Sequence, residues 1–204
     1  MREKSTETLI LEAAEREFLA KGFAGARTTA IAEDAGVTHA MLHYYFRSKQ
    51  NLFDRIVESK IELLDRLVFS AFDDDSFPLA ERLSRGIAAH FDFVADNPGL
   101  PAFMITQLNA DSSVRLKIVA AVGDMVNRLS TSLQRQIDAD ASRGLCERID
   151  ARMLLLDMAS LNVFIFLAAP MVDPMVSGLF GDRKAFLEAR KQENITTILK
   201  RLKP

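Results

Sequence analysis

The sequence contains only one cysteine, Cys146, and no tryptophan among its 204 residues. A single cysteine cannot form a disulfide within the chain, so a disulfide-stabilised secreted scaffold is excluded. We therefore expect a reducing, cytoplasmic setting. The opening segment MREKSTET is polar and runs directly into a helical pattern, so we expect no signal peptide.

The sequence also lacks an excess of charge of one sign, because the formal net charge is only −2. Nucleic-acid-binding proteins are often basic, and the overall composition does not suggest one. Residues 1–60 contain nine Lys or Arg and nine Asp or Glu, which balance. Residues 38–49, however, contain two cations, two histidines and no acid. Hydrophobic residues are 49% and charged residues 26%, which excludes a disordered chain.

A long uninterrupted hydrophobic run is absent as well. The most apolar segment, residues 153–172, is broken by Asp157, Ser160 and Asn162. A membrane-spanning helix requires about 20 mostly apolar residues without charge, so we interpret this segment as a buried interface helix. We find no strand alternation of useful length and no internal repeat. The sequence therefore predicts an all-α fold.

The spacing of apolar residues predicts about nine helices, three small ones followed by a body of six. The first covers residues 5–21, with Ser5 or Thr6 as cap and Gly22 as stop. Ser48 is suited to cap a long amphipathic helix that ends at the acidic run 73–75 and Pro78. Further helices are predicted over 79–95, 101–109, 113–141, 151–169 and 183–202. Asp150 and Asp182 are the predicted caps of the last two, and Pro170 and Pro174 the predicted end of 151–169.

Residues 28–49, TTAIAEDAGVTHAMLHYYFRSK, have the pattern of two short helices joined by a tight turn. Gly36 supplies the positive φ that a sharp reversal needs. The apolar positions that would hold the two helices together are Ile31, Ala32, Val37, Leu42 and Phe46. The second helix has long polar side chains between its apolar positions. This arrangement predicts a helix-turn-helix whose second helix enters the DNA major groove.

The same stretch closely resembles the DNA-binding domain of TetR-family transcriptional regulators. The resemblance lies in Ile31-Ala32, in 35–38 (Ala-Gly-Val-Thr), in 42–46 (Leu-His-Tyr-Tyr-Phe) and in Lys49. One position departs from the family, because His43 stands where tyrosine is usual. The resemblance implies a DNA-binding domain over 1–49 and a helical effector-binding and dimerisation domain over 50–204, linked by a helix over about 49–70. It also implies a homodimer that acts most often as a repressor.

DNA contacts can be assigned to individual residues of this stretch. A helix N-terminus favours anions, so Thr28, Thr29 and the preceding Arg27 are expected at phosphates. The resemblance assigns Lys49 and Tyr45 to phosphate as well. The expected base readers are Thr38, His39, Ala40, Met41 and Tyr44, with His43 at either a phosphate or a base edge.

Two further sites are expected in the helical body. Apolar and occasional polar side chains of the kind that line ligand cavities are His90, Phe91, Phe103, Met104, Gln107, Met125, Arg128, Asn162 and Phe164. The expected dimer surface comprises Met153, Leu154, Asp157, Met158, Leu161, Ile165, Phe186 and Arg190. For any single residue of either set, a place in the internal core is an equal or stronger interpretation. The effector is expected to be an unidentified small molecule.

Two other functional classes fit the sequence less well. An enzyme is not supported, because the sequence has no Walker loop, dinucleotide glycine fingerprint or nucleophile elbow. His39 and His43, four residues apart, have the spacing of metal ligands but lack an obvious third ligand, so we expect no metal and no cofactor. The alternative that stays open is a helical ligand- or protein-binding module that has lost DNA binding.

Overall fold

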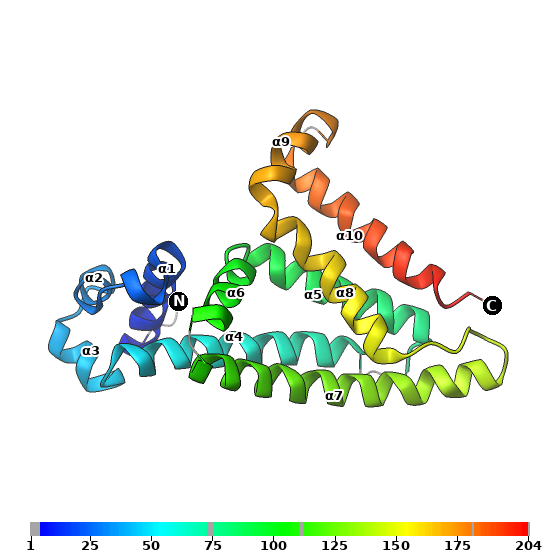
Figure 1. The fold of residues 1–204 in the computed structure, drawn as a ribbon, viewed down its shortest axis with the longest axis horizontal. Helices are drawn as coiled ribbons and strands as arrows, with labels where there is room; N and C mark the ends of the chain where they lie inside the picture. The colour runs from blue at the N-terminus through cyan, green and yellow to red at the C-terminus, as the bar shows by residue number, and fades with distance from the viewer. Residues whose placement is uncertain (1–4, 73–75, 111, 181, 204) are drawn as a thin grey trace. The chain divides into compact units, whose positions relative to one another are not determined.

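The computed structural model describes residues 5–72, 76–110, 112–180 and 182–203, and these ranges form ten α-helices and no strand (Figure 1). The predicted all-α fold class is therefore confirmed. The helices are α1 (Thr6–Gly25), α2 (Thr28–Asp34), α3 (His39–Phe46), α4 (Lys49–Phe72), α5 (Leu79–Asp96), α6 (Leu100–Ala110), α7 (Ser112–Ser142), α8 (Ala151–Leu167), α9 (Ala169–Phe180) and α10 (Arg183–Lys200). The acidic run predicted to end the fourth helix, 73–75, lies outside the described residues.

The helix starts follow the predicted caps. The Ser5 hydroxyl accepts from the backbone N–H of Thr8 at 3.2 Å at the start of α1. The carboxylates of Asp150 and Asp182 accept backbone N–H groups in the first turns of α8 and α10, each at 2.7 Å. Such side chains satisfy donors that have no partner inside the helix, so a polar residue before an apolar run fixes where the helix begins.

Helix α9 corrects the prediction of nine helices, in which Pro170 and Pro174 ended the preceding one. Helix α8 does end, at Leu167, but a new helix begins two residues later and contains both prolines. Pro170 lies in the first turn of α9, where proline is tolerated because the N–H it lacks would have no partner there, whereas Pro174 lies inside the helix. Within the described ranges, no single helix is both long and apolar enough to cross a bilayer, although α8 and 169–176 reach that length together across an 80° bend.

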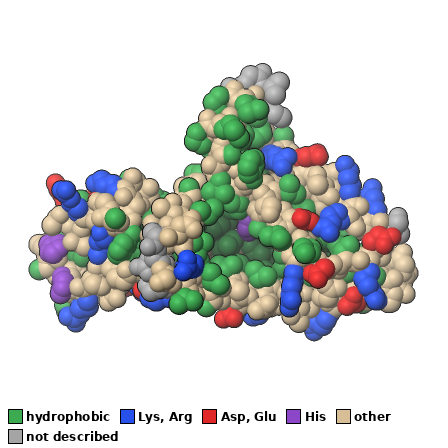
Figure 2. Space-filling model, viewed as in Figure 1, with side chains coloured by type: hydrophobic (Ala, Val, Ile, Leu, Met, Phe, Trp, Pro, Cys, Tyr) green, Lys and Arg blue, Asp and Glu red, His purple; other side chains and the backbone are tan. Residues whose placement is uncertain are grey.

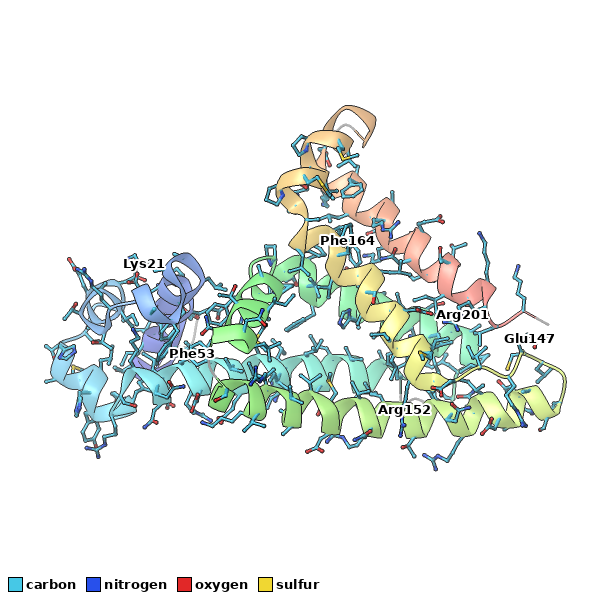
Figure 3. All side chains as sticks on the ribbon, in the orientation of Figure 1. Lys21, Phe53, Glu147, Arg152, Phe164 and Arg201 are labelled. Atoms are coloured by element: carbon cyan, nitrogen blue, oxygen red, sulfur yellow. The ribbon has the colours of Figure 1, made fainter. Side chains whose placement is uncertain are left out.

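The chain divides into two compact units, and the first comprises residues 1–62 and 103–118. Aromatic rings form much of its core. The ring of Phe53 is 5.4 Å from Phe18, 5.1 Å from Phe23 and 5.5 Å from Phe103, measured between centroids (Phe53 is labelled in Figure 3). The other buried residues come from every helix of the unit up to α4 and include Ile10, Ala13, Ala14, Ile31, Ala32, Leu42, Phe46, Leu52 and Ile56. This core holds α2 and α3 against α1 and α4.

The second unit comprises residues 63–102 and 119–204, with α5, α8 and α10 packed against one another. Its larger hydrophobic cluster includes Val68, Phe72, Leu83, Ile87, Leu129, Leu133, Ile137, Leu154, Met158 and Ile198. A second cluster contains Phe91, Phe93, Val94, Ile165, Phe166 and Phe186. These residues are apolar at helical spacing on five different helices, so their burial accounts for the packing of the unit.

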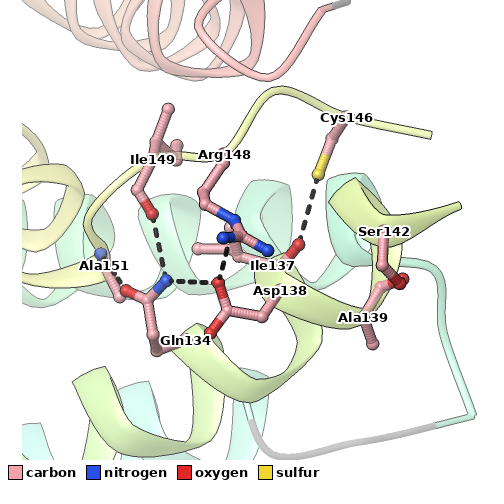
Figure 4. Close-up of polar contacts among 9 residues, drawn as sticks. All are labelled: Gln134, Ile137, Asp138, Ala139, Ser142, Cys146, Arg148, Ile149 and Ala151. Carbon is pink, nitrogen blue, oxygen red and sulfur yellow. Dashed lines mark hydrogen bonds and ion pairs between the residues drawn. The ribbon is translucent and has the colours of Figure 1, made fainter. Parts of the chain in front are cut away.

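The connection from α7 to α8 is held by Gln134 (Figure 4). The Gln134 amide nitrogen donates to the carbonyl of Ile149 at 3.2 Å, and its oxygen accepts the N–H of Ala151 at 2.8 Å. Nearby, the Cys146 thiol donates to the carbonyl of Ile137 at 3.7 Å. Burial raises the pKa of this thiol, so Cys146 is an unreactive part of the packing.

Two helical glycines predict opposite effects of the same substitution. A Cβ atom at Gly86 would lie 2.2 Å from the ring of Phe72, which is 1% exposed, whereas a Cβ at Gly123 meets nothing within 4 Å. Gly123→Ala should stabilise the fold by about 0.5–1 kcal/mol, the usual gain from replacing a helical glycine. Gly86→Ala should instead destabilise it by about 1–3 kcal/mol through overpacking. Urea unfolding at one fixed protein concentration measures both, and equal stabilities for the two variants would contradict the prediction.

Candidate nucleic-acid interface

The turn between α2 and α3 has the geometry that the sequence predicts. Gly36 has a φ of 68°, and the N–H of Val37 donates to the carbonyl of Ala32 at 2.9 Å. On α3 the side chains of Leu42 and Phe46 are 2% and 5% exposed and face the core. The fold therefore leaves the opposite side of α3 to solvent.

The outward side of α3 carries the predicted base readers. Tyr44 is 70% exposed, Tyr45 43% and Met41 40%, and His39, Ala40 and His43 are exposed as well. The rings of Tyr44 and Tyr45 meet edge to face with their centroids 5.5 Å apart. We call the exposed residues His39, Ala40, Met41, His43, Tyr44 and Tyr45 the α3 face. Large hydrophobic and aromatic groups so exposed on a short helix are costly unless something covers them.

Two of the residues predicted to contact DNA are hydrogen-bonded to each other. The Thr28 hydroxyl, at the start of α2, lies 3.1 Å from His39 Nε2 at the start of α3. Thr38 caps α3, because its hydroxyl oxygen accepts the N–H of Met41 at 3.2 Å. Its hydroxyl hydrogen is still available to donate. These bonds fix the starts of both helices relative to each other.

A surface concavity of about 450 Å³ brings most of the predicted phosphate contacts together. We call it the basic cradle, and its lining residues are Ala26, Arg27, Thr28, Thr29, His39, Leu42, His43, Arg47, Ser48 and Lys49. It contains three cations and no acid, although residues 1–60 as a whole are neutral. Placement rather than composition therefore produces the positive site.

Arg47 is a lining residue that the sequence did not reveal. It has a φ of 62° and a ψ of −44°, and the N–H of Ser48 donates to the carbonyl of Phe46 at 2.6 Å across it. This is a γ-turn with positive φ, a strained conformation for a residue with a side chain. No sequence signal marks it, because nothing in the residue type favours that conformation. The turn directs the chain from α3 into α4 in two residues.

Lys49 has a structural role in addition to the one predicted. Its ammonium donates to the carbonyls of Ala26 at 2.9 Å and Ala24 at 3.3 Å and lies 4.7 Å from the ring centroid of Phe23. These contacts hold the end of α1. An ammonium has three donors, so one N–H is left for a phosphate. Because removal of Lys49 would alter both roles, Arg47 is the better residue for testing phosphate contacts.

The predicted effector residues fall into both units. Phe103, Met104 and Gln107 belong to the first unit, where Phe103 packs on Phe53. In the second unit, His90, Phe91, Met125 and Asn162 are buried, and Asn162 is bonded to His90. Arg128 is exposed and pairs with Asp65 at 2.6 Å, and Phe164 is 55% exposed. Of the set, His90 and Asn162 are the polar pair that the second unit brings together.

The buried His90 predicts a fold that loses stability in mild acid. Burial lowers its pKa from the ordinary 6.5 to about 4. As the pH falls below 6.5, the unfolded chain takes up a proton that the folded chain does not, so stability is lost between pH 6.5 and pH 4. The loss between pH 7 and pH 5 should be about 2 kcal/mol. Chemical unfolding at each pH measures it.

The control is His90→Gln, whose side chain does not titrate. The other titrating groups are the same in both proteins, so the difference between them isolates His90. The free energies of unfolding of the two proteins should converge as the pH falls from 7 to 5. A constant difference would show that His90 is charged in the folded state or exposed.

The predicted dimer residues separate into a buried and an exposed set. Leu154, Met158, Ile165 and Phe186 are 7% exposed or less and lie in the core of the chain. Leu161 and Arg190 are half-buried, and Asp157 pairs with Arg201. Among the predicted residues, Met153 is the apolar one that is fully on the surface, at 57%. Helix α8 is apolar on both sides, so its sequence could not tell the core face from the outer one.

The outer face of α8 is an apolar row that the sequence did not identify. Met153, Leu156, Phe164 and Leu167 are 57%, 60%, 55% and 36% exposed (Phe164 is labelled in Figure 3). Their spacing of three and four residues, with Ser160 between them, places them on one side of the helix. On α9, Met171 and Met175 are exposed as well, and Figure 2 shows hydrophobic side chains gathered over α9. We call the four α8 residues the α8 stripe.

Comparison with known sequences finds relatives that share the helix-turn-helix region of this chain. A family model described as "Bacterial regulatory proteins, tetR family" matches residues 10–56. The nucleoid occlusion factor SlmA of Marinomonas sp. (strain MWYL1) is 28% identical over 124 residues, which cover 59% of this chain and 61% of that protein. The uncharacterized HTH-type transcriptional regulator Rv1255c of Mycobacterium tuberculosis (strain ATCC 25618 / H37Rv) is 33% identical over 116 residues. These residues cover 55% of this chain and 57% of that protein. The matches thus span about three-fifths of these relatives.

Solved structures resemble the whole chain in fold. The fatty acid degradation regulator FadR from Bacillus halodurans has a TM-score of 0.72 at 19% identity, covering 98% of this chain and 97% of its own. FadR from Bacillus subtilis, in complex with stearoyl-CoA, has a TM-score of 0.71 at 18% identity, covering 96% and 98%. At these identities the likeness establishes the arrangement of the helices.

Proposed function

Since this chain belongs to the TetR family of bacterial regulatory proteins, we propose that it binds a palindromic DNA operator as a homodimer, represses transcription there, and is released by a small-molecule effector. The observation that carries the proposal is the exposed α3 face beside the basic cradle. Side chains that can read base edges and cations that can bind phosphates adjoin one another, as a helix in a major groove requires.

The division of labour follows from chemistry and position. Arg27, Arg47 and Lys49 line the cradle and are suited to phosphates, together with the N–H groups at the start of α2. The α3 face offers a phenol at Tyr44, a ring nitrogen at His43 and a methyl group at Ala40. These groups can discriminate base edges in the major groove. Phosphate contacts set affinity and position, and the α3 face sets sequence preference.

A homodimer is proposed for two reasons. One helix-turn-helix motif reads few base pairs, and the exposed apolar side chains of the α8 stripe would be buried by a second protomer. A two-fold axis would bring the stripe of one protomer against the same stripe of another, and would place two α3 helices on a palindrome. A cytoplasmic location, where operator DNA is reached, belongs to the same proposal.

An effector is proposed because two fold neighbours are fatty acid regulators by name, and one was solved with stearoyl-CoA. Apolar acyl compounds are therefore the first effectors to test. A ligand shifts DNA affinity only by its difference in affinity for the two conformations, and couplings of about 1–3 kcal/mol are typical.

The test is selection of bound sequences from a random double-stranded DNA pool, followed by a salt titration on the enriched sequence. We expect a palindromic motif. Three cradle cations in each of two protomers would neutralise about six phosphates, so affinity should fall about 10³-fold between 50 and 200 mM salt. The alternative, a helical binding module without DNA binding, predicts no enriched motif and little salt dependence.

A further inference from the structure

Three buried amide and imidazole side chains join α10, α8 and α5 in the second unit. The Asn194 amide nitrogen donates to Asn162 Oδ1 at 2.9 Å and to the carbonyl of Leu161 at 3.2 Å. The Asn162 amide nitrogen donates to the carbonyl of Ile87 at 3.0 Å and lies 3.1 Å from His90 Nδ1. An amide nitrogen has two hydrogens, so both amides are fully used as donors. The chain of bonds therefore runs in one direction, from Asn194 to His90.

The direction of this relay fixes the tautomer of His90. Its Nδ1 receives a hydrogen from Asn162 and must be unprotonated, so the neutral ring carries its hydrogen on Nε2. Burial keeps the ring neutral, because it lowers the pKa of His90 to about 4. No hydrogen bond of Nε2 is found among the described residues, and His90 as a whole is 8% exposed. One oriented N–H donor is therefore left on a buried ring.

The part of the second unit that contains His90 is largely apolar. The neighbour of His90 in sequence, Phe91, packs on Phe166 with ring centroids 5.8 Å apart, and Ile165 and Phe186 belong to the same cluster. In Figure 2, hydrophobic side chains border a hollow in which a histidine side chain is visible. At the other end of the relay, Asn194 Oδ1 is buried without a hydrogen-bond partner. A single polar group in an apolar wall is the usual means of orienting a ligand.

We propose that His90 is the residue that determines effector specificity, and that its Nε2–H donates to an uncharged oxygen, a carbonyl or ester, on an otherwise apolar molecule. This inference rests on the proposed function, because it assumes that the second unit receives an effector. An ammonium group would meet another donor at this position, and a carboxylate would lose its hydration among apolar side chains. The relay through Asn162 is what prevents the ring from turning its acceptor nitrogen to the ligand.

The first test uses the wild-type protein. In a long-range ¹H–¹⁵N spectrum, the ring of His90 should show a protonated Nε2 and an unprotonated Nδ1. Titration with methyl decyl ketone should shift the Nε2 resonance, whereas dodecane and dodecylamine should leave it in place. His39 and His43 are exposed and serve as internal controls. A protonated Nδ1, no Nε2 shift with the ketone, or an equal shift with the amine would each overturn the proposal.

The second test compares two variants. His90→Gln keeps an N–H donor near the position of Nε2, and His90→Phe keeps the ring shape without any donor. The preference for the ketone over dodecane should be retained in the first and fall about three- to tenfold in the second, the usual effect of one neutral hydrogen bond. An equal loss of the preference for the ketone in both variants, or no loss in either variant, would contradict the role of His90. Both readouts are independent of DNA, so failure of operator binding leaves them interpretable, and failure here leaves operator binding unaffected.

Discussion

Leu156→Asp should convert the protein from dimer to monomer at micromolar concentration. Leu156 is 60% exposed within the α8 stripe and does not belong to the buried core of its own chain. In a two-fold interface the substitution occurs twice. Each leucine loses about 1.5–3 kcal/mol of burial, so dimerisation should weaken by about 3–6 kcal/mol, on the order of 100- to 10,000-fold. Sedimentation equilibrium measures the change.

The matched control is Leu145→Asp. Leu145 is 61% exposed, as Leu156 is, but lies in the connection between α7 and α8 and outside the stripe. It should leave dimerisation unchanged. If Leu156→Asp sediments like the wild-type dimer, the stripe is not the interface, and a monomeric wild type would refute the homodimer itself.

Tyr44→Ala should remove most of the affinity for the selected operator while leaving the fold intact. Tyr44 is 70% exposed, so its loss exposes little of the core. A specific base contact contributes about 1–3 kcal/mol, and a dimer has two of them, so binding should weaken by about 2–6 kcal/mol. This corresponds to a range on the order of 30- to 20,000-fold. Binding to a scrambled sequence should change much less, and fluorescence anisotropy on both duplexes measures the difference.

Arg47→Ala is the informative contrast to Tyr44→Ala. Loss of a phosphate contact should weaken the operator and the scrambled duplex to a similar extent, and should reduce the slope of the salt dependence by about two per dimer. Leu19→Ala, on the exposed side of α1, should change neither quantity. If Tyr44→Ala weakens both duplexes equally, the phenol contacts the DNA backbone and base reading must be assigned elsewhere on the α3 face.

The features that the sequence predicted well are those set by neighbours along the chain. Ser5, Asp150 and Asp182 cap the predicted helices because a capping bond spans only two or three residues. The turn at Gly36 is equally local. Buried and exposed sides of α2 and α3 followed from helical periodicity, so the inward Leu42 and the outward Tyr44 were both placed correctly.

What the sequence missed depends on contacts between distant segments. Helix α8 is apolar all round, and only the packing of α5 and α10 determines that Leu154 is buried and Leu156 exposed. Residues 103–118 join the first unit although 40 residues of the second precede them in the chain, which no periodicity reveals. Pro174 predicts a helix end, because the cost of proline inside a helix is usually decisive, yet α9 contains it. Arg47 entered the cradle through a backbone conformation that its residue type disfavours.

The uninterrupted α4 has a mechanical consequence. Its 24 residues extend about 36 Å without a break, and two residues connect its first turn to the end of α3. Over a helix of that length, a tilt of about 5° at one end corresponds to a displacement of about 3 Å at the other. Base-edge hydrogen bonds tolerate displacements of only a few tenths of an ångström. A tilt of α4 by only a few degrees would therefore be enough to misalign Tyr44 in a groove.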